Sequence, residues 1–255
     1  MLSKAKVKYI HSLELKKYRN EHNAFIAEGN KLVADMLPAF ECELLIAKQS
    51  WLDTQSLVLA HEFIVADDSD IRKASLLKNP QDVIAIFKCP TWDMAEVNPA
   101  RELVLALDNV QDPGNLGTIV RLADWFGINH IVCSQDTVDV FNPKTVQATM
   151  GALAHVKVIY TDLETFLTEQ STHSIPLYGT FLDGENIYST TLSKNGILIM
   201  GNEGNGIHPS IGSLVNQRLY IPPFPKGKKT SESLNVAIAT AILCAEFRRR
   251  QRQSS

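Results

Sequence analysis

This sequence of 255 residues lacks the segments that mark membrane and exported proteins. It contains no apolar run of the roughly 18 residues that a bilayer-spanning helix needs. Its beginning, MLSKAKVKYIHSLELKK, is charged throughout and has no apolar core of the kind found in secretion signals. We therefore expect a cytoplasmic protein with no membrane association.

Cysteine is scarce as well. The four cysteines, Cys42, Cys89, Cys133 and Cys244, include no Cys-x-x-Cys pair. Disulfide frameworks and zinc sites need closer and more regular spacing, and the seven histidines are scattered too. The sequence thus predicts reduced, mostly packed cysteines and no metal.

The net charge of −3 argues against a uniformly basic nucleic-acid binder. The charge is nevertheless uneven, because residues 1–20 carry six lysines and arginines against one acid. Residues 226–252 carry seven against two. These basic ends indicate either contacts with phosphates or solvated helix ends, and both interpretations stay open at this point.

The first part of the chain has the pattern of a small α/β module. Residues 22–37 have apolar residues at helical spacing and are expected to form a helix. Strands are expected at 43–48, 62–67 and 82–88, with a capped helix at 69–77. The linker candidate is CPTWDMAEVNPARE, with two prolines, which places a domain boundary near residue 95.

Beyond this boundary strands and helices alternate. The expected strands are 103–108, 130–134, 156–160, 176–181, 196–201 and 218–222, and the expected helices are 115–126, 143–154, 161–169, 208–215 and a long one from about 231. Short apolar strands separated by helices predict an α/β fold with a mostly parallel sheet that is covered on both faces. In such sheets ligands bind at the carboxyl ends of the strands.

Three loops that follow strands are rich in Gly, Pro, Asn or Ser. The first lies in LDNVQDPGNLGTIVRLADWFG, which lacks both G-x-G-x-x-G and the P-loop pattern. In it Asn115 is either a helix N-cap or a site residue. Arg121 lies beside the apolar stripe of the helix, as a snorkelling side chain or as a fork for phosphate or carboxylate.

The other two loops carry further polar side chains. ILIMGNEGNGIHPSI puts Glu203 among glycines, in a turn at a helix entrance or in a binding site. At the end of the third loop, SESLNVAIA offers Ser231, Ser233 and Asn235 where a helix needs only one cap. This surplus favours a ligand site.

Taken in order, GNLGTIVR, MGNEGNGI and IP…SLNVAIA resemble the motifs of the SpoU/TrmH family of RNA ribose 2′-O-methyltransferases, over roughly residues 100–250. FIAEGNKLV resembles the substrate-binding domain that precedes the catalytic domain in many members. The resemblance implies a small α/β, ribosomal L30-like RNA substrate-binding domain at 1–95 and a methyltransferase domain at 96–255.

The resemblance also implies a SPOUT fold with a C-terminal trefoil knot, S-adenosylmethionine as the methyl donor and no metal. It implies a homodimer whose subunits complete each other's sites, acting on ribosomal or transfer RNA. The implied catalytic residues are Asn115, Arg121, Glu203, Ser233 and Asn235. The implied donor-binding residues are Thr180, Gly201, Ile221 and Leu234. The loop at 222–232 is longer and more basic than is usual in the family.

The three motifs contain no His, Cys or Lys to remove the proton of a ribose hydroxyl. A guanidinium is a poor base, so we expect Arg121 to hold RNA phosphate and the 2′-oxygen instead. Two other functions remain under consideration. One is a catalytically inactive RNA-binding protein of the same fold, and the other is a small-molecule enzyme with a generic α/β nucleotide site.

Overall fold

The computed structural model describes residues 2–224 and 233–253, and the chain forms two compact units. The first unit comprises residues 1–91 and 139–155, and the second comprises residues 92–138 and 156–255. The last helix, predicted from about residue 231, begins only at Val236, since residues 233–235 are not helical.

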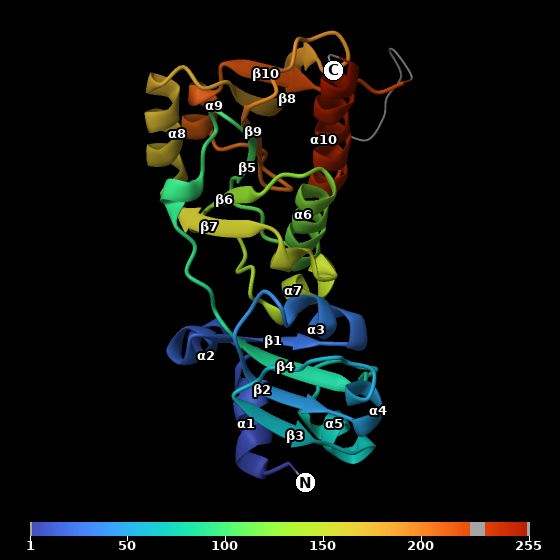
Figure 1. Ribbon diagram of the computed structural model, residues 1–255. Helices are drawn as coiled ribbons and strands as arrows, with labels where there is room; N and C mark the ends of the chain where they lie inside the picture. Colours follow the sequence, from blue (N-terminus) through green and yellow to red (C-terminus); the bar gives the residue numbers. More distant parts are fainter. Residues whose placement is uncertain (1, 225–232, 254–255) are drawn as a thin grey trace. The chain divides into compact units, whose positions relative to one another are not determined.

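The first unit is built on a four-stranded sheet (Figure 1). The strand order is β1-β4-β2-β3, with β4 antiparallel to β1 and β2, and β3 parallel to β2. The strands predicted for this module are confirmed as β2, β3 and β4. Its elements are α1 (Lys4–Ser12), α2 (Lys16–His22), β1 (Ala24–Glu28), α3 (Asn30–Met36), β2 (Cys42–Ala47), α4 (Gln49–Leu52), β3 (Glu62–Val65), α5 (Asp68–Ala74), β4 (Val83–Lys88), α7 (Pro143–Thr149) and the 3₁₀ turn η2 (Ala152–Ala154).

The prediction of one helix over 22–37 is wrong, because this stretch is a strand followed by a short helix. All five residues of β1 are buried, so the strand shows no alternation of apolar and polar residues that could reveal it. Gly29 separates the two elements with a φ of 116°, a conformation that glycine adopts readily. Phe25 and Met36 therefore reach the core from different elements.

Segment 139–155 is anchored in the first unit by aromatic packing and an ion pair. The Phe141 ring lies 4.7 Å from the ring of Phe25, which itself lies 5.6 Å from Phe87. Arg19 is only 2% exposed and donates from Nε and Nη2 to Asp139 Oδ2 at 2.9 and 2.6 Å. Residues that follow β6 in the sequence thus complete the core of the N-terminal unit.

The helix predicted at 143–154 is shorter than expected. It ends at Thr149, because Met150 and Gly151 have φ values of 53° and 95°. Such left-handed backbone cannot continue a right-handed helix, and a 3₁₀ turn follows.

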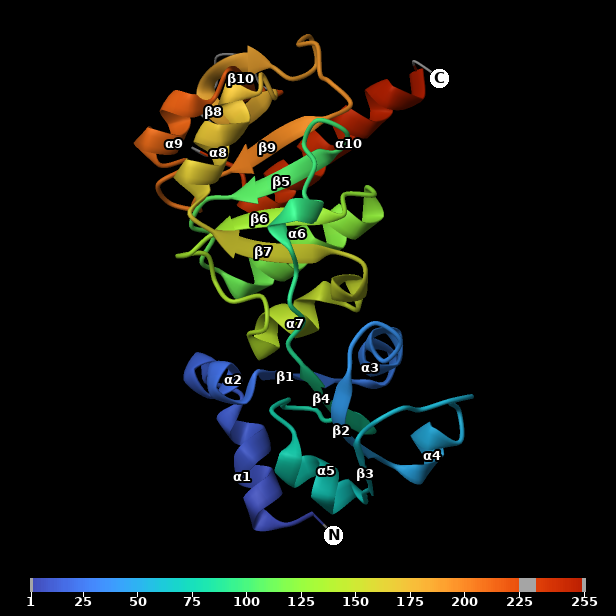
Figure 2. The same ribbon diagram turned by 60° about the vertical axis from the view of Figure 1, so that its left-hand side comes forward.

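The second unit contains a six-stranded sheet with the order β10-β8-β9-β5-β6-β7, and every neighbouring pair is parallel. Helices α6 and α10 lie side by side on one face, and α8 and α9 lie on the other (Figures 1 and 2). The predicted α/β fold with helices on both faces is confirmed. Its elements are η1 (Met94–Glu96), β5 (Leu103–Leu107), α6 (Pro113–Trp125), β6 (His130–Ser134), β7 (Lys157–Thr161), α8 (Leu163–Thr172), β8 (Leu177–Asn186), β9 (Gly196–Met200), α9 (Pro209–Leu214), β10 (Gln217–Tyr220) and α10 (Val236–Gln253).

Candidate active site

The site lies at the carboxyl ends of two neighbouring strands of the parallel sheet. In the ladder between β5 and β9, Leu107 is paired with Met200, the last residue of each strand. The loops after these strands therefore begin side by side, as expected for a ligand site in an α/β sheet.

Three of the predicted site residues form one chain of hydrogen bonds. Asn235 Nδ2 donates to Asn115 Oδ1 at 2.9 Å, and Asn115 Nδ2 donates to Glu203 Oε1 at 3.0 Å. Asn235 Oδ1 accepts from the backbone N–H groups of Ala237 and Ile238 at 3.0 and 3.2 Å, and so caps α10. The helix end thereby orients the Asn235 amide, which orients Asn115, which in turn presents a donor to the Glu203 carboxylate.

Glu203 is held as an anion. The backbone N–H groups of Gln111 and Asp112 donate to its two oxygens, each at 3.3 Å. Partial burial raises the pKa of Glu203, but the hydrogen bonds from Asn115 and from these backbone groups outweigh it, and the net pKa is lowered. The carboxylate is therefore an acceptor and a weak base at neutral pH.

The prediction that Asn115 is a helix N-cap is wrong. Asp112 is the N-cap of α6, since its Oδ1 accepts from the Asn115 backbone N–H at 2.8 Å. The Asn115 side chain is thus available to Glu203. Glu203 lies in a turn, but not at the entrance of the helix that follows it, because α9 begins at Pro209 and is capped by His208. Its carboxylate instead accepts from backbone N–H groups at the start of α6.

Glu203 projects from a tight turn that closes on the preceding strand. Asn202 and Gly206 exchange backbone hydrogen bonds at 2.9 and 3.0 Å, which closes the turn. A Cβ on Gly201 would lie 2.2 Å from the carbonyl carbon of Gly206. Only glycine therefore fits at this position.

The structure does not bring the other two predicted catalytic residues into the chain of hydrogen bonds. Arg121 is exposed on α6, and it forms no hydrogen bond or ion pair with the residues at 2–224 and 233–253. Ser233 is exposed too, with no hydrogen bond to another residue in this part of the chain.

The predicted donor-binding residues lie at the same edge of the sheet. Gly201 follows β9 and Ile221 follows β10, and β8 lies between these two strands. Gly201 is buried, Ile221 is half-buried and Leu234 is 47% exposed. Backbone groups just beyond a strand end lie outside the regular ladder and need other hydrogen-bond partners.

Thr180 begins an irregular stretch of β8. Arg218 of β10 pairs with Gly179, whereas the next residue, Leu219, pairs with Glu185. Residues 180–184 therefore bulge out of this ladder, which turns Thr180 away from regular strand pairing.

Sequence reasoning missed the backbone donors at Gln111 and Asp112 and the side chain of Asn202. A backbone N–H has no signature in the side-chain sequence, so the first two could not have been found. Asn202 had a signal, because asparagine between Gly201 and Glu203 is well suited to a tight turn.

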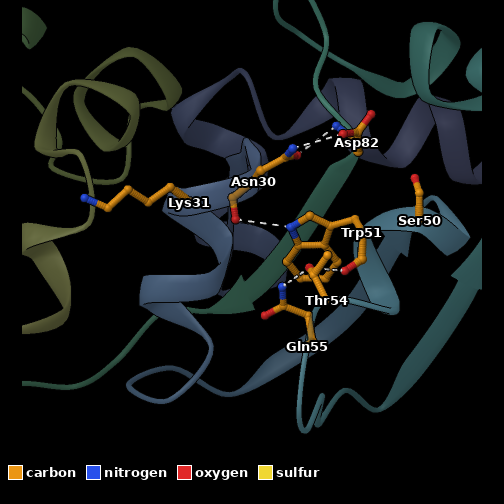
Figure 3. A pocket seen from close by; sticks show the side chains of 7 residues that line it. All are labelled: Asn30, Lys31, Ser50, Trp51, Thr54, Gln55 and Asp82. Carbon is orange, nitrogen blue, oxygen red and sulfur yellow. Dashed lines mark hydrogen bonds between the residues drawn. The ribbon is translucent and has the colours of Figure 1, made fainter.

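The first unit has a cavity of about 410 Å³ (Figure 3), at the edge where β1 and β2 end and β4 begins. Asn30 bonds Asp82 twice, through Nδ2 to the carboxylate at 2.9 Å and through Oδ1 to the backbone N–H at 3.0 Å. The Trp51 indole N–H donates to the Asn30 carbonyl at 3.2 Å. The cavity is lined by Asn30, Lys31, Ser50, Trp51, Thr54, Gln55 and Asp82.

The two basic ends of the chain differ in the structure. Three arginines near the C-terminus are held internally: Arg248 donates to the carbonyls of Phe126 and Gly127, and Arg249 and Arg250 both donate to Glu246. At the other end Lys8, Lys16 and Lys17 are exposed and form no ion pair within the part of the chain that the structure describes. The basic residues at 226–229 lie outside the described residues.

Of the helices in the described segments, none is long and apolar enough to cross a membrane. The same segments contain no cluster of three or more His, Cys, Asp or Glu side chains placed to hold a metal ion.

A parallel sheet with a polar site at the carboxyl ends of its strands is the architecture of the α/β proteins that bind ligands at this edge, and comparison with known proteins defines the family. Residues 102–245 match the SpoU rRNA Methylase family, and residues 4–85 match the MRM3-like substrate binding domain. The first match spans more than half of the chain. The chain belongs to the SpoU rRNA methylase family, and it is an RNA methyltransferase.

Three similar proteins match this chain over nearly its whole length. The 23S rRNA (guanosine(2553)-2′-O)-methyltransferase RlmP of Bacillus subtilis is 32% identical over 95% of this chain and 96% of that protein. The solved structure of a TrmH-family protein from Porphyromonas gingivalis is 43% identical, with a TM-score of 0.88, and covers 98% of this chain and 99% of that one. The AdoMet-bound rRNA methyltransferase from Sinorhizobium meliloti is 32% identical, with a TM-score of 0.84, over 98% and 96%.

Proposed function

We propose that this protein transfers the methyl group of S-adenosylmethionine to a ribose 2′-hydroxyl of ribosomal RNA. The hydrogen-bonded chain of Asn235, Asn115 and Glu203 carries this proposal, because it joins three loops far apart in the sequence around one carboxylate. The names of the relatives support ribosomal RNA as the substrate class. The cytoplasm, where bacterial ribosomal RNA resides, is the expected compartment.

The methyl donor would be held by the backbone of Gly201, Ile221 and Leu234, with Thr180 beside them, in loops that form the knot of the SPOUT fold. When bound, S-adenosylmethionine supplies an electrophilic methyl group. Rate acceleration then depends on aligning the hydroxyl with this methyl group, which can contribute about 7–11 kcal/mol in favourable cases.

The side chains of the network act on the RNA. Glu203 accepts a hydrogen bond and orients either the ribose hydroxyl or the Arg121 guanidinium, while Asn115 fixes the carboxylate. Arg121 holds an RNA phosphate and stabilises the alkoxide that develops on the 2′-oxygen. The hydroxyl proton passes to a phosphate oxygen of the RNA. Ser233 and Asn235 contact polar edges of the donor or of the substrate.

A homodimer would bring Arg121 to this network. Arg121 and Trp125 are four residues apart on α6 and share an exposed helix face. Trp125 is 84% exposed, and Ile238 on the neighbouring α10 is 53% exposed. Exposed apolar side chains of this size are typical of interaction surfaces. A second copy that covers Trp125 would place Arg121 at the interface, within reach of the other subunit's site.

The first unit would bind the RNA substrate. Lys8, Lys16 and Lys17 on its first two helices are available for phosphates, and the cavity beside Trp51 is large enough for a nucleotide. Phe25 and Trp51 are buried, so they are core residues rather than stacking platforms for bases.

The test is methyl transfer itself. The purified protein is incubated with methyl-labelled S-adenosylmethionine and ribosomal RNA from a strain that lacks the gene. Label is expected in 2′-O-methylated nucleotides after nuclease digestion. RNA that binds without acquiring label would favour the inactive RNA-binding protein, and label on a base would contradict the proposed chemistry.

A further inference from the structure

Asn202 stands between the two loops of the candidate active site and uses its whole amide group. Its Oδ1 accepts from the backbone N–H groups of Gly204 and Asn205 at 2.9 and 3.0 Å. Its Nδ2 donates to the carbonyl of Asn109 at 2.8 Å. Because the oxygen faces two N–H donors, the orientation of the amide is fixed. One side chain therefore shapes the Glu203 turn and ties it to the loop after β5.

The loop after β5, which Asn202 contacts, turns at a left-handed residue, Asn109. Asn109 has a φ of 56°, a left-handed conformation that asparagine adopts more readily than most residues. Its backbone N–H donates to Ser134 Oγ at 2.9 Å, and its Oδ1 accepts from Gln111 Nε2 at 3.1 Å. Asn109 is thus held from β6 on one side and from Asn202 on the other.

This loop supplies two donors to Glu203. The N–H groups of Gln111 and Asp112 reach the carboxylate at 3.3 Å, which is near the long end of hydrogen-bond distances. Bonds of this length are lost through a small displacement of either loop. The Asn202 bond to Asn109 is shorter and ties the loop after β5 to the turn that carries Glu203, while the backbone N–H of His208, beyond that turn, donates to Asp108 Oδ2 at 2.6 Å.

We propose that Asn202 is a positioning residue for methyl transfer, which acts through Glu203 without touching the reacting atoms. The inference rests on the proposed function, since it assigns Glu203 to the reaction. Loss of the Asn202–Asn109 bond lets the loop after β5 move away from Glu203. The carboxylate then loses its backbone donors and its fixed position relative to Asn115.

Two substitutions separate the two halves of the amide. Asn202→Asp keeps an oxygen for Gly204 and Asn205 but removes the donor to Asn109. Asn202→Ala removes both. Asn205→Ala is the matched control, because the Asn205 side chain is exposed and forms no hydrogen bond with residues of the described segments.

The first readout is kinetic. Turnover of ribosomal RNA by Asn202→Asp is expected to fall on the order of tenfold to a hundredfold, because small misplacements at a reacting centre have effects of this size. KM for RNA and the affinity for S-adenosylhomocysteine should stay within about twofold, since no RNA or donor contact is removed. Asn205→Ala should match the wild type. Equal turnover in Asn202→Asp and Asn205→Ala would overturn the inference.

The second readout is amide hydrogen exchange in the full-length protein, which does not depend on activity. The Gln111 and Asp112 N–H groups should exchange faster in Asn202→Asp than in Asn205→Ala. Unchanged exchange would overturn the inference even if turnover fell. If the wild type methylates no RNA, the proposed function fails, whereas faster exchange would still establish that Asn202 holds this loop.

Discussion

The two units of this protein use polar side chains in different ways. In the second unit, amides and a carboxylate from three loops form a directional chain that ends at Glu203. In the first unit, polar side chains line an open cavity, and lysines stand exposed on the first two helices. The difference suggests where function is sensitive: fixed geometry in the second unit should govern turnover, and exposed groups in the first should govern RNA affinity.

The largest effect is expected for Arg121, which tests whether the second unit governs turnover. Arg121→Ala should lower methyl transfer to RNA by about a hundredfold or more, because a donor to the developing charge is lost. Binding of S-adenosylhomocysteine, measured by calorimetry, should be unchanged. Arg101→Ala, another exposed arginine of the second unit, is the control. Near-normal turnover of Arg121→Ala would remove this residue from the mechanism.

The next prediction concerns stability in the first unit. Arg19→Ala leaves the Asp139 carboxylate, whose side chain is only 13% exposed, without its partner. We expect the free energy of unfolding to fall by about 3 kcal/mol, as for other broken buried ion pairs. Urea unfolding measures the loss, with the exposed Arg72→Ala as the control. A change below about 1 kcal/mol, typical of surface pairs, would mean that segment 139–155 does not depend on this pair.

A smaller stability effect is expected in the second unit and depends on pH. Hydrogen bonds from Arg249, opposed by partial burial and supported by Arg250, lower the pKa of Glu246 from 4.5 to about 2. A lowered pKa stabilises the folded state above pH 4.5, and this contribution is lost as the pH falls toward 2. Glu246→Gln should therefore destabilise the protein at pH 7 by about 1–2 kcal/mol.

Unfolding of Glu246→Gln at acid pH separates the effect of charge from that of packing. The stability difference between Glu246→Gln and the wild type should shrink when urea unfolding is repeated near pH 3. An equal difference at both pH values would show that packing, rather than charge, explains the loss.

The smallest effect is expected for the cavity of the first unit. The double variant Lys31→Ala with Gln55→Ala removes an ammonium group and an amide that line it. KM for ribosomal RNA should rise about fivefold, since a few contacts of this kind contribute about 1 kcal/mol together. Turnover at saturating RNA should not change, and Lys144→Ala is the control for lost charge. A fall in turnover at constant KM would contradict the division of roles between the units.

The sequence predicted the second unit better than the first, for a physical reason. Short buried strands that alternate with helices are typical of one architecture, a parallel sheet with helices on both faces, so this sheet was predictable from residue 103 onward. In the first unit the strand at 24–28 is fully buried and has no alternation of apolar and polar residues, so the sequence pattern predicts a helix there instead. Nothing in the local sequence signals that residues 139–155 return to this unit, because their partners, such as Arg19 and Phe25, are more than a hundred residues away.

The sequence predicted some residues of the candidate active site and missed others. The resemblance to the SpoU/TrmH motifs singled out Asn115, Glu203 and Asn235, which the structure joins. Local sequence alone favoured a ligand site only at Asn235, through the surplus of capping residues there. The cap at Asp112 was missed, because Asn115 is an equally good capping residue from local sequence. The contribution of Asn202 depends on a carbonyl 93 residues away, which only the folded structure brings into contact.

The central claim is that the loops after β5, β9 and β10 form one site for methyl transfer. A crystal structure of the protein with S-adenosylhomocysteine tests it most directly. We predict that the ligand contacts the backbone of Gly201, Ile221 and Leu234, with its sulfur on the side of Glu203. A ligand bound at another edge of the sheet, or on the first unit, would contradict the account.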